Sequence, residues 1–228
     1  MGRMGNPRRR RHRRVFTMML PLAVGAAACG SGDDVPETAD ESPAATLASC
    51  SVERHVVAFD YFGTVSVADA DLGDWLKDVN DAPDARPGVA EVATAYRERG
   101  YEVLYITTAP SIIDLGGAPI GDRIADWLTE KGFPLGEGTT LWVWDGNHTP
   151  MRGISGELDR LVSEGATIDA AYTDNEDKAL AFKSAVQSDR VYTLGSGAAT
   201  SGTTPIANDD MVAHLPDIEA LAQVCQRP

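Results

Sequence analysis

The most constraining feature of this chain is an apolar run at 56–59 that ends abruptly in Asp60 and is followed three residues later by a Gly-Thr turn at 63–64. An apolar run bounded by a turn is typical of a buried strand in a parallel sheet. Open α/β sheets bind their ligands at the carboxyl ends of such strands. We therefore expect Asp60 to belong to a functional site.

Apolar segments with strand character alternate with segments of helical periodicity over the rest of the chain. Helices between successive strands require crossover connections, which predict a parallel sheet with helices on both faces. The expected fold class is α/β, with three layers and a mostly parallel five-stranded sheet. The segment between Thr64 and Pro87 is too short for a helical cap domain. The expected strands are 55–60, 102–107, 141–144, 168–173 and 190–194; helices are expected from Pro87 to Gly100, around 124–128 and 158–162, at 176–187 and at 216–225; and 195–210 is expected to be an irregular loop.

The first 28 residues have the layout of an export signal. Seven arginines precede an apolar stretch at 15–28 that is short for a membrane span. The stretch ends in Ala-Ala-Ala-Cys-Gly, which resembles a bacterial lipobox and implies lipidation of Cys29. This resemblance predicts an exported lipoprotein of the bacterial cell envelope, attached to a membrane through its lipid. A cytosolic protein with a basic tail is the alternative.

The segment that follows, 29–49, is acidic and rich in Ser, Pro and Ala, so we expect a flexible tether. The remaining residues, 50–228, are enough for one domain with a proper core. The whole chain has 20 basic and 34 acidic side chains, and without the seven signal arginines its net charge is −21. Such a surface disfavours nucleic acid, which binds clustered Lys and Arg. We expect a monomer that binds any anionic ligand through a local site.

Two cysteines, Cys50 and Cys225, flank this domain. Export permits a disulfide between them, which would stabilise the fold by about 5 kcal/mol because it closes a long loop. Two separate thiols are the alternative, since Cys225 also lies on an apolar helical face.

Oxygen-bearing side chains follow several of the expected strands. Asp60 follows the first strand, Thr107 and Thr108 the second, and Asp174 and Asp177 the fourth. The carboxyl ends of parallel strands meet at one sheet edge, and converging carboxylates there are suited to Mg²⁺. The hydroxyls and the free N–H groups of a turn would complete a phosphate cradle. Alternatively, Asp174 and Asp177 cap the following helix.

The layout of 52–222 resembles the haloacid dehalogenase (HAD) superfamily of phosphohydrolases. Within it, the chain is most similar to the lipin-like (LNS2-type) domain of phosphatidate phosphatases and phosphatidylinositol transfer proteins. The segments that carry this resemblance are Arg-Pro-Gly-Val at 86–89, Gly-Tyr-Glu-Val-Leu-Tyr-Ile-Thr-Thr-Ala-Pro at 100–110, Gly-Phe-Pro at 132–134, Asp-Gly at 145–146 and Met-Val-Ala-His-Leu at 211–215.

The resemblance assigns roles to individual residues. Asp60 matches the catalytic nucleophile and metal ligand, and Thr107 matches the hydroxyl of the second motif. Phe62 stands where the superfamily usually has an acidic proton donor, although its backbone carbonyl would still bind the metal. The resemblance further implies Asp174 and Asp177 as metal ligands, and Gly63, Thr64, Thr108 and Arg152 as phosphate-binding residues. The usual phosphate-neutralising Lys is missing before the fourth strand, which leaves Arg152 as the basic residue with suitable placement.

Loss of a general acid removes about 10²–10⁴-fold of catalysis. The leading hypothesis is therefore a degenerate phosphatase site that binds Mg²⁺ and a phosphorylated small molecule or phospholipid headgroup. An active Mg²⁺-dependent phosphohydrolase with Asp60 as nucleophile is the first alternative, and a structural envelope lipoprotein with a vestigial site is the second. A haloacid dehalogenase also lacks the second Asp, but the missing cap argues against it.

Overall fold

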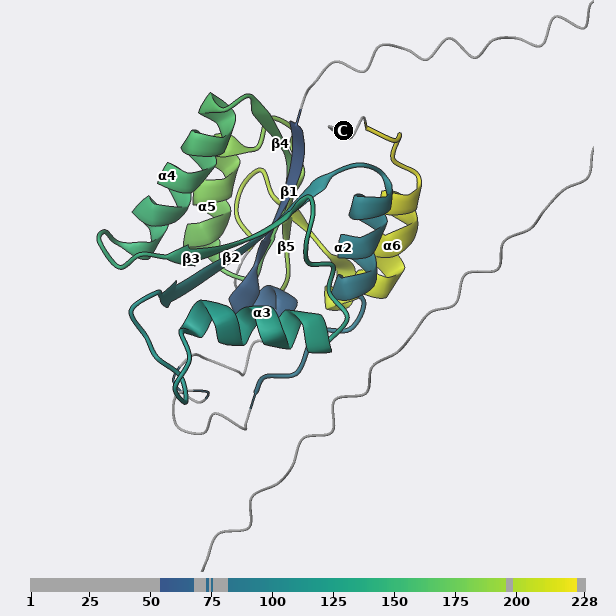
Figure 1. Cartoon of the computed structure of the whole chain (residues 1–228). Helices are drawn as coiled ribbons and strands as arrows, with labels where there is room; N and C mark the ends of the chain where they lie inside the picture. The colour runs from purple at the N-terminus through teal and green to yellow at the C-terminus, as the bar shows by residue number, and fades with distance from the viewer. Residues whose placement is uncertain (1–53, 68–72, 74, 76–81, 196–198, 225–228) are drawn as a thin grey trace, which may run out of the picture. The chain divides into compact units, whose positions relative to one another are not determined.

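A computed structural model of the chain describes residues 54–67, 73, 75, 82–195 and 199–224. Five parallel pairings join its strands into one sheet of six, in the order β3-β2-β1-β4-β5-β6 (Figure 1). The strands are β1 (Arg54–Asp60), β2 (Glu102–Pro110), β3 (Thr139–Trp144), β4 (Ala166–Thr173), β5 (Val191–Thr193) and β6 (Thr204–Pro205). The chain thus has the expected parallel α/β fold.

Helices cover both faces of this sheet. One face carries α2 (Val89–Glu98), α3 (Ile120–Glu130) and α6 (Met211–Glu219), and the other carries α4 (Pro150–Ser163) and α5 (Glu176–Ala185). Figure 1 shows α2 beside α6 and α4 beside α5. Two short helical turns, η1 (Tyr61–Val65) and η2 (Ala207–Asp209), complete the described elements.

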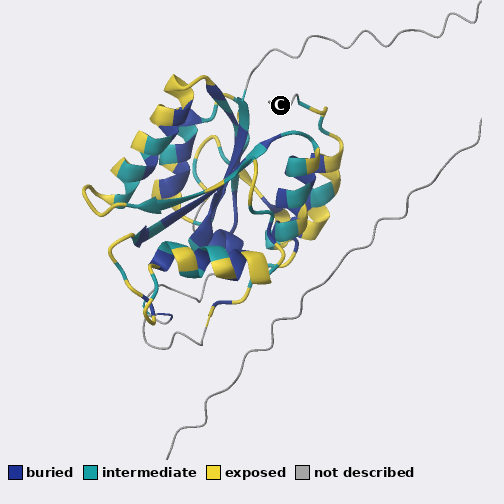
Figure 2. Cartoon of the chain, in the orientation of Figure 1, coloured by how far each residue is buried: buried dark blue, intermediate teal, exposed yellow. Residues whose placement is uncertain are grey.

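The alternation of side chains in β1 explains why this strand is central. Val57 and Phe59 enter the core under α2, α3 and α6, while Val56 and Ala58 enter the core under α4 and α5. Successive side chains of a strand point to opposite faces, so a strand buried on both faces is apolar throughout. Figure 2 shows the buried central strands between partly exposed helices.

Two expectations about chain organisation are corrected. The sheet has a sixth strand, β6, because Thr204–Pro205 pairs with β5 inside the segment that we expected to be an irregular loop. The closing helix spans Met211–Glu219 instead of 216–225, because Asp210 accepts a hydrogen bond from the backbone N–H of Ala213 and so caps an earlier start. The export signal, the tether, Cys29, Cys50 and Cys225 lie outside the described residues, and so does part of the segment between Thr64 and Pro87, where a cap would be inserted. No helix in the described part of the chain has both the length and the apolar character to cross a membrane.

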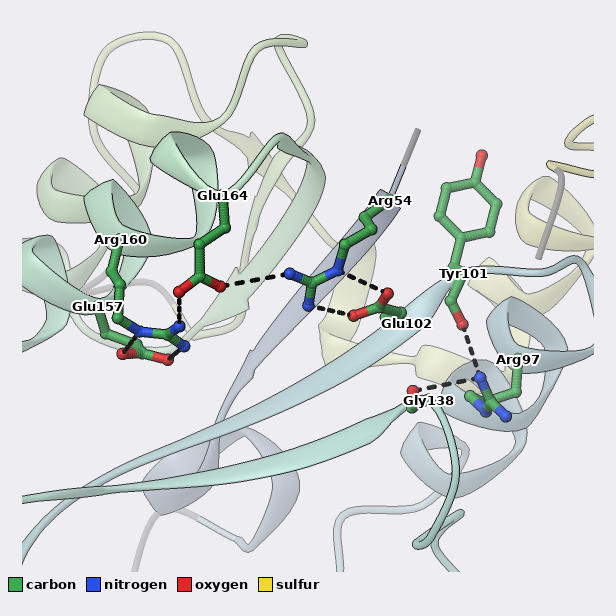
Figure 3. A network of polar contacts seen from close by, with 8 residues as sticks. All are labelled: Arg54, Arg97, Tyr101, Glu102, Gly138, Glu157, Arg160 and Glu164. Carbon is green, nitrogen blue, oxygen red and sulfur yellow. Dashed lines mark hydrogen bonds and ion pairs between the residues drawn. The ribbon is translucent and has the colours of Figure 1, made fainter. Parts of the chain in front are cut away.

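An ion-pair network ties the amino-terminal ends of the sheet together (Figure 3). Arg54 of β1 donates two hydrogen bonds to Glu102 of β2, at 2.9 and 2.7 Å, and a longer one to Glu164 after α4. Glu164 also pairs with Arg160 of α4. The network holds β1, β2 and α4 together at the edge opposite to Asp60.

A buried hydrogen-bond chain joins the sheet to α2 and α6. The hydroxyls of Tyr96 and Tyr172 lie 2.9 Å apart, and the Tyr172 hydroxyl lies 3.0 Å from Nε2 of His214. Nδ1 of His214 faces Asp217 at 3.2 Å. Burial lowers the pKa of His214. These contacts give His214 a structural role, and they explain how the segment at 211–215 is fixed to the core.

Candidate metal and phosphate site

Asp60 is the last residue of β1 and is fully buried at the carboxyl edge of the sheet. Asp60 pairs with Ile106 of β2, and the residue before it, Phe59, pairs with Tyr172 of β4. A carboxylate at zero exposure is stable only when charges or hydrogen bonds compensate it. The contacts of Asp60 therefore define the site.

Lys178 supplies the compensating charge. Its Nζ lies 2.7 Å from Oδ1 and 2.8 Å from Oδ2 of Asp60, and Lys178 is itself 7 % exposed. The sequence has no Lys between Gly132 and Thr173, ahead of the fourth strand, and the cation that pairs with Asp60 comes instead from α5, after that strand, where sequence reasoning did not look for it. Arg152, the residue expected in this role, is an exposed residue in the first turn of α4 and forms no hydrogen bond or ion pair with Asp60 among the described contacts.

Several threonines were expected or found at this edge of the sheet, and Thr173 contacts Asp60. Thr173, the last residue of β4, donates its hydroxyl to Oδ2 of Asp60 at 3.0 Å, a contact that sequence reasoning missed. Thr107 is fully buried in β2, and its Oγ1 accepts the backbone N–H of Ala109 at 3.2 Å. Thr64 is also fully buried, and its Oγ1 has no hydrogen-bond partner in the described part of the chain. Thr108 is partly exposed.

The turn after Asp60 is shaped by a close contact between Gly63 and Asp174. Gly63 has φ of +79°, and a Cβ built on it would lie 1.7 Å from Oδ2 of Asp174. Only glycine permits both this backbone conformation and this approach. The contact places the Asp174 carboxylate against the turn that follows Asp60, so two of the expected metal ligands share one site.

Asp177 does not complete a three-carboxylate cluster. It is exposed in the first turn of α5, and the described residues contain no group of three or more His, Cys, Asp and Glu side chains that could hold a metal ion. The helix cap is Asn175, whose Oδ1 accepts the backbone N–H of Lys178 at 3.1 Å. The alternative that Asp174 or Asp177 caps this helix is therefore wrong. Asp177 lies in the first turn, where its negative charge interacts favourably with the positive end of the helix dipole.

Phe62 lies partly buried in the turn, with an extended backbone at φ −74° and ψ 128°. Its ring packs edge-to-face on Tyr61, with ring centroids 4.9 Å apart. No ionisable group replaces the missing carboxylate at this position, so the side chain at position 62 cannot transfer a proton.

Burial controls the charge of this site. Desolvation raises the pKa of Asp60 to about 6, with Lys178 opposing the rise and Asp174 adding to it. Burial also raises the pKa of Asp174, and Lys178 and Arg86 act against that rise. Asp60 is therefore ionised at neutral pH and becomes protonated in mildly acidic solution.

This shift predicts how stability depends on pH. The folded state binds the Asp60 proton more tightly than the unfolded state, so the contribution of Asp60 to stability is full below pH 4 and is lost as the pH rises through about 6. A shift of about two pH units corresponds to about 3 kcal/mol. The free energy of unfolding of the wild-type protein, measured relative to Asp60→Asn by urea titration, should fall by about this amount between pH 4 and pH 7. A difference that is constant with pH would contradict the raised pKa.

The two carboxylates at this turn, Asp60 and Asp174, are of the kind that hold a magnesium ion. Mg²⁺ is usually held by one or two carboxylates, retained waters and substrate phosphate oxygens. Asp60, Asp174 and the backbone carbonyl of Phe62 would be the protein ligands of such an ion. This assignment rests on the close contact between Gly63 and the Asp174 carboxylate, which places Asp174 against the turn that follows Asp60.

The Gly63–Asp174 contact can be tested directly. Gly63→Ala should destabilise the protein by at least about 2 kcal/mol, since the left-handed conformation alone costs about 1–2 kcal/mol and the new methyl group displaces Asp174. Gly117→Ala is a matched control, because Gly117 has φ of +85° with nothing within 4 Å of the added Cβ. Urea unfolding should show the smaller loss for Gly117→Ala, and equal losses would contradict the close contact.

Comparisons with known proteins relate this chain to a family and a fold. A family model described as the LNS2 domain of PITM 1-3 matches residues 64–195. Protein retinal degeneration B of Drosophila melanogaster is 27% identical over 142 residues, which cover 61% of this chain and 10% of that protein. Human membrane-associated phosphatidylinositol transfer protein 3 is 27% identical over 141 residues, which cover 60% of this chain and 13% of that protein. The chain thus matches only about a tenth of the length of these relatives.

Solved structures give the same fold. D,D-heptose 1,7-bisphosphate phosphatase from B. bronchiseptica, complexed with magnesium and phosphate, aligns with a TM-score of 0.50 and 15% identity over 73% of this chain and 99% of that one. A protein described as a HAD-like phosphatase from Mesorhizobium loti aligns with a TM-score of 0.51 and 16% identity over 76% of this chain and 90% of that one. The family model covers more than half of the chain, and the chain therefore belongs to the LNS2 domain family, on a HAD-like fold.

Proposed function

We propose that this domain binds a phosphate group together with Mg²⁺ at the edge of the sheet around Asp60, and that it hydrolyses phosphoesters poorly. The observation that carries the proposal is the arrangement of Asp60, which contacts Lys178 and Thr173 while Phe62 replaces the proton donor. This arrangement supports a site that keeps the binding elements of a phosphatase and lacks a catalytic one. The structure of the bacterial phosphatase that aligns with this chain holds magnesium and phosphate, which supports the ligand class.

Each retained residue has a defined part in this binding. Asp60, Asp174 and the Phe62 carbonyl would hold Mg²⁺, which supplies positive charge to a bound phosphate. Lys178 holds Asp60 in place and reduces its repulsion of an incoming anion. The tight turn at Gly63 and Thr64 offers phosphate oxygens its backbone N–H groups and the Thr64 hydroxyl, which has no partner in the part of the chain that the structure describes.

Thermal unfolding of the full chain tests the proposal. MgCl₂ with inorganic phosphate at about 100 times the dissociation constant should raise the unfolding temperature by roughly 5–10 °C, since such saturation contributes about 2.7 kcal/mol. Asp174→Asn should abolish the rise, and Asp177→Asn should preserve it because Asp177 is exposed away from Asp60. An unchanged unfolding temperature in the wild-type protein would leave a vestigial site as the better account.

The ligand can be free or part of a lipid, since both present the same phosphate chemistry. Binding to glycerol phosphate in solution identifies a small phosphorylated molecule. Binding only to vesicles that contain a phosphomonoester lipid identifies a headgroup. We favour the headgroup, because the lipidation expected at Cys29 would hold the domain near a bilayer.

A second function, phosphoester hydrolysis with Asp60 as nucleophile, is favoured by one observation. The ammonium group of Lys178 contacts both carboxylate oxygens of Asp60. A nearby cation reduces the repulsion between a carboxylate nucleophile and the phosphate that it attacks. Turnover of a phosphomonoester by the wild-type protein with Mg²⁺, lost in Asp60→Asn, would establish this function and remove the binding-only account.

We further propose that the protein is an exported, lipid-anchored, monomeric component of the bacterial cell envelope. The arginine-rich segment, the apolar stretch and Cys29 support this location. Cys29→Ser should move the protein from the membrane fraction to the soluble fraction, and mass spectrometry should detect acyl groups only on the wild-type chain.

A further inference from the structure

The segment just before α2 is attached to the turn that follows Asp60. The backbone N–H of Arg86 donates to the Val65 carbonyl at 2.9 Å, and the backbone N–H of Val67 donates to the Asp84 carbonyl at 3.0 Å. An antiparallel bridge between Ser66 and Ala85 lies between these two hydrogen bonds. This short pairing brings the side chain of Arg86 back over the turn of the candidate site.

The Arg86 guanidinium binds two consecutive backbone carbonyls of that turn. Its Nη2 donates to the Gly63 carbonyl at 2.5 Å, and its Nε donates to the Thr64 carbonyl at 3.2 Å. Arg86 is half-buried and forms no ion pair with any residue in the described ranges. A guanidinium presents several N–H donors in a rigid plane, so it can fix two acceptors at once.

The two carbonyls belong to the residues that shape the site. Gly63 packs against the Asp174 carboxylate, and Thr64 carries the buried hydroxyl that has no partner among the described residues. The charge of Arg86 also acts on Asp174, where it opposes the rise in pKa that burial causes. Arg86 is therefore linked both to the shape of the turn and to the charge of a proposed metal ligand.

We propose that Arg86 is the positioning residue of this site: it clamps the Gly63–Thr64 turn in the conformation that receives Mg²⁺ and phosphate. The inference rests on the proposed function for the identity of the ligands. It assigns a function to the Arg of the Arg-Pro-Gly-Val segment, which lies far from Asp60 in the sequence and contains none of the residues that bind the ligands.

Hydrogen exchange without ligand tests the clamp first. Arg86→Gln and Arg86→Lys should each speed amide exchange at Val65, Ser66 and Val67 by at least about tenfold, because neither side chain can replace the two-carbonyl contact. Arg97→Gln is the matched control, since Arg97 also binds backbone carbonyls, those of Tyr101, Glu137 and Gly138, at the opposite edge of the sheet (Figure 3). Unchanged exchange at 65–67 in both Arg86 variants would overturn the clamp whether or not the protein binds a ligand.

Calorimetric titration with MgCl₂ and inorganic phosphate tests the functional part. Both Arg86 variants should bind at least about tenfold more weakly than the wild-type protein, while Arg97→Gln should bind with wild-type affinity even if its unfolding temperature falls. Wild-type affinity in both Arg86 variants would overturn the inference. Wild-type affinity in Arg86→Lys alone would also overturn it, because the positive charge by itself would then account for the contribution of Arg86 to binding. Absence of binding in the wild-type protein would refute the proposed function itself and, with it, the functional role of Arg86.

Discussion

Replacing Lys178 by Met is expected to lower the free energy of unfolding by about 3–5 kcal/mol at pH 7. The change leaves the Asp60 carboxylate fully buried, with Thr173 as its remaining hydrogen-bond donor. Removing one partner of a buried ion pair is costly because the other charge stays uncompensated. The loss should be smaller at pH 5, where Asp60 accepts a proton. Urea unfolding of the full chain at both pH values measures the two effects.

A second substitution separates the ion pair from the packing of the Lys178 side chain. Adding Asp60→Asn to Lys178→Met removes the stranded charge, and the double variant should recover at least about 2 kcal/mol of the loss. Lys183→Met, on the same helix, is the control; Lys183 contacts the Ser201 carbonyl near the surface, so its loss should cost less than about 1 kcal/mol. A double variant that is less stable than Lys178→Met would show that the pair is not the source of the effect.

Replacing Phe62 by Asp is expected to raise the rate of phosphomonoester hydrolysis by about 10²–10⁴-fold over the wild-type protein in the presence of Mg²⁺. The substitution returns a proton donor to the position where the superfamily usually has one, and general acid catalysis contributes about this factor. The backbone at Phe62 is extended, so an aspartate fits without strain. Lost packing against Tyr61 should cost only modest stability, since Phe62 is partly exposed.

Two controls show whether the gain comes from proton transfer. Phe62→Asn has nearly the same shape as Phe62→Asp but no acidic proton, and it should remain at the wild-type rate. Adding Asp60→Asn to Phe62→Asp should abolish the new activity, because the nucleophile is lost. Equal rates for Phe62→Asp and Phe62→Asn, measured with a chromogenic phosphomonoester, would contradict the account of a missing acid.

The alternation of the main strands with helices and the two-sided burial of the sheet were predictable from the sequence. Both follow from local patterns: a short apolar run such as 56–59, bounded by a turn, is typical of a strand covered on both faces, and the helical segments between strands indicate parallel connections. Asp60 was predictable for the same reason, since the end of an apolar run marks the end of a strand. Strand β6 was not predictable, because Thr204–Pro205 has no apolar periodicity and is defined only by its pairing with β5.

The residues that contact Asp60 could not be predicted from local sequence patterns. Asp177 and Lys178 are adjacent in the sequence, and reading the motif alone favoured Asp177 as part of the site. Successive residues of a helix are rotated by about 100°, so only one of the two can face Asp60. Asn175 caps α5, and the packing of Ala179 and Phe182 against the sheet sets the rotation that buries Lys178 and exposes Asp177.

The sequence by itself thus determined that a carboxylate ends a central strand and that an aromatic ring stands two residues later, because these features depend only on neighbouring residues. The tertiary structure alone decided which cation compensates that carboxylate, that Asp174 packs on Gly63, and that Arg86 holds the turn. These contacts join residues up to 118 positions apart, and their geometry depends on how helices are rotated and docked on the sheet.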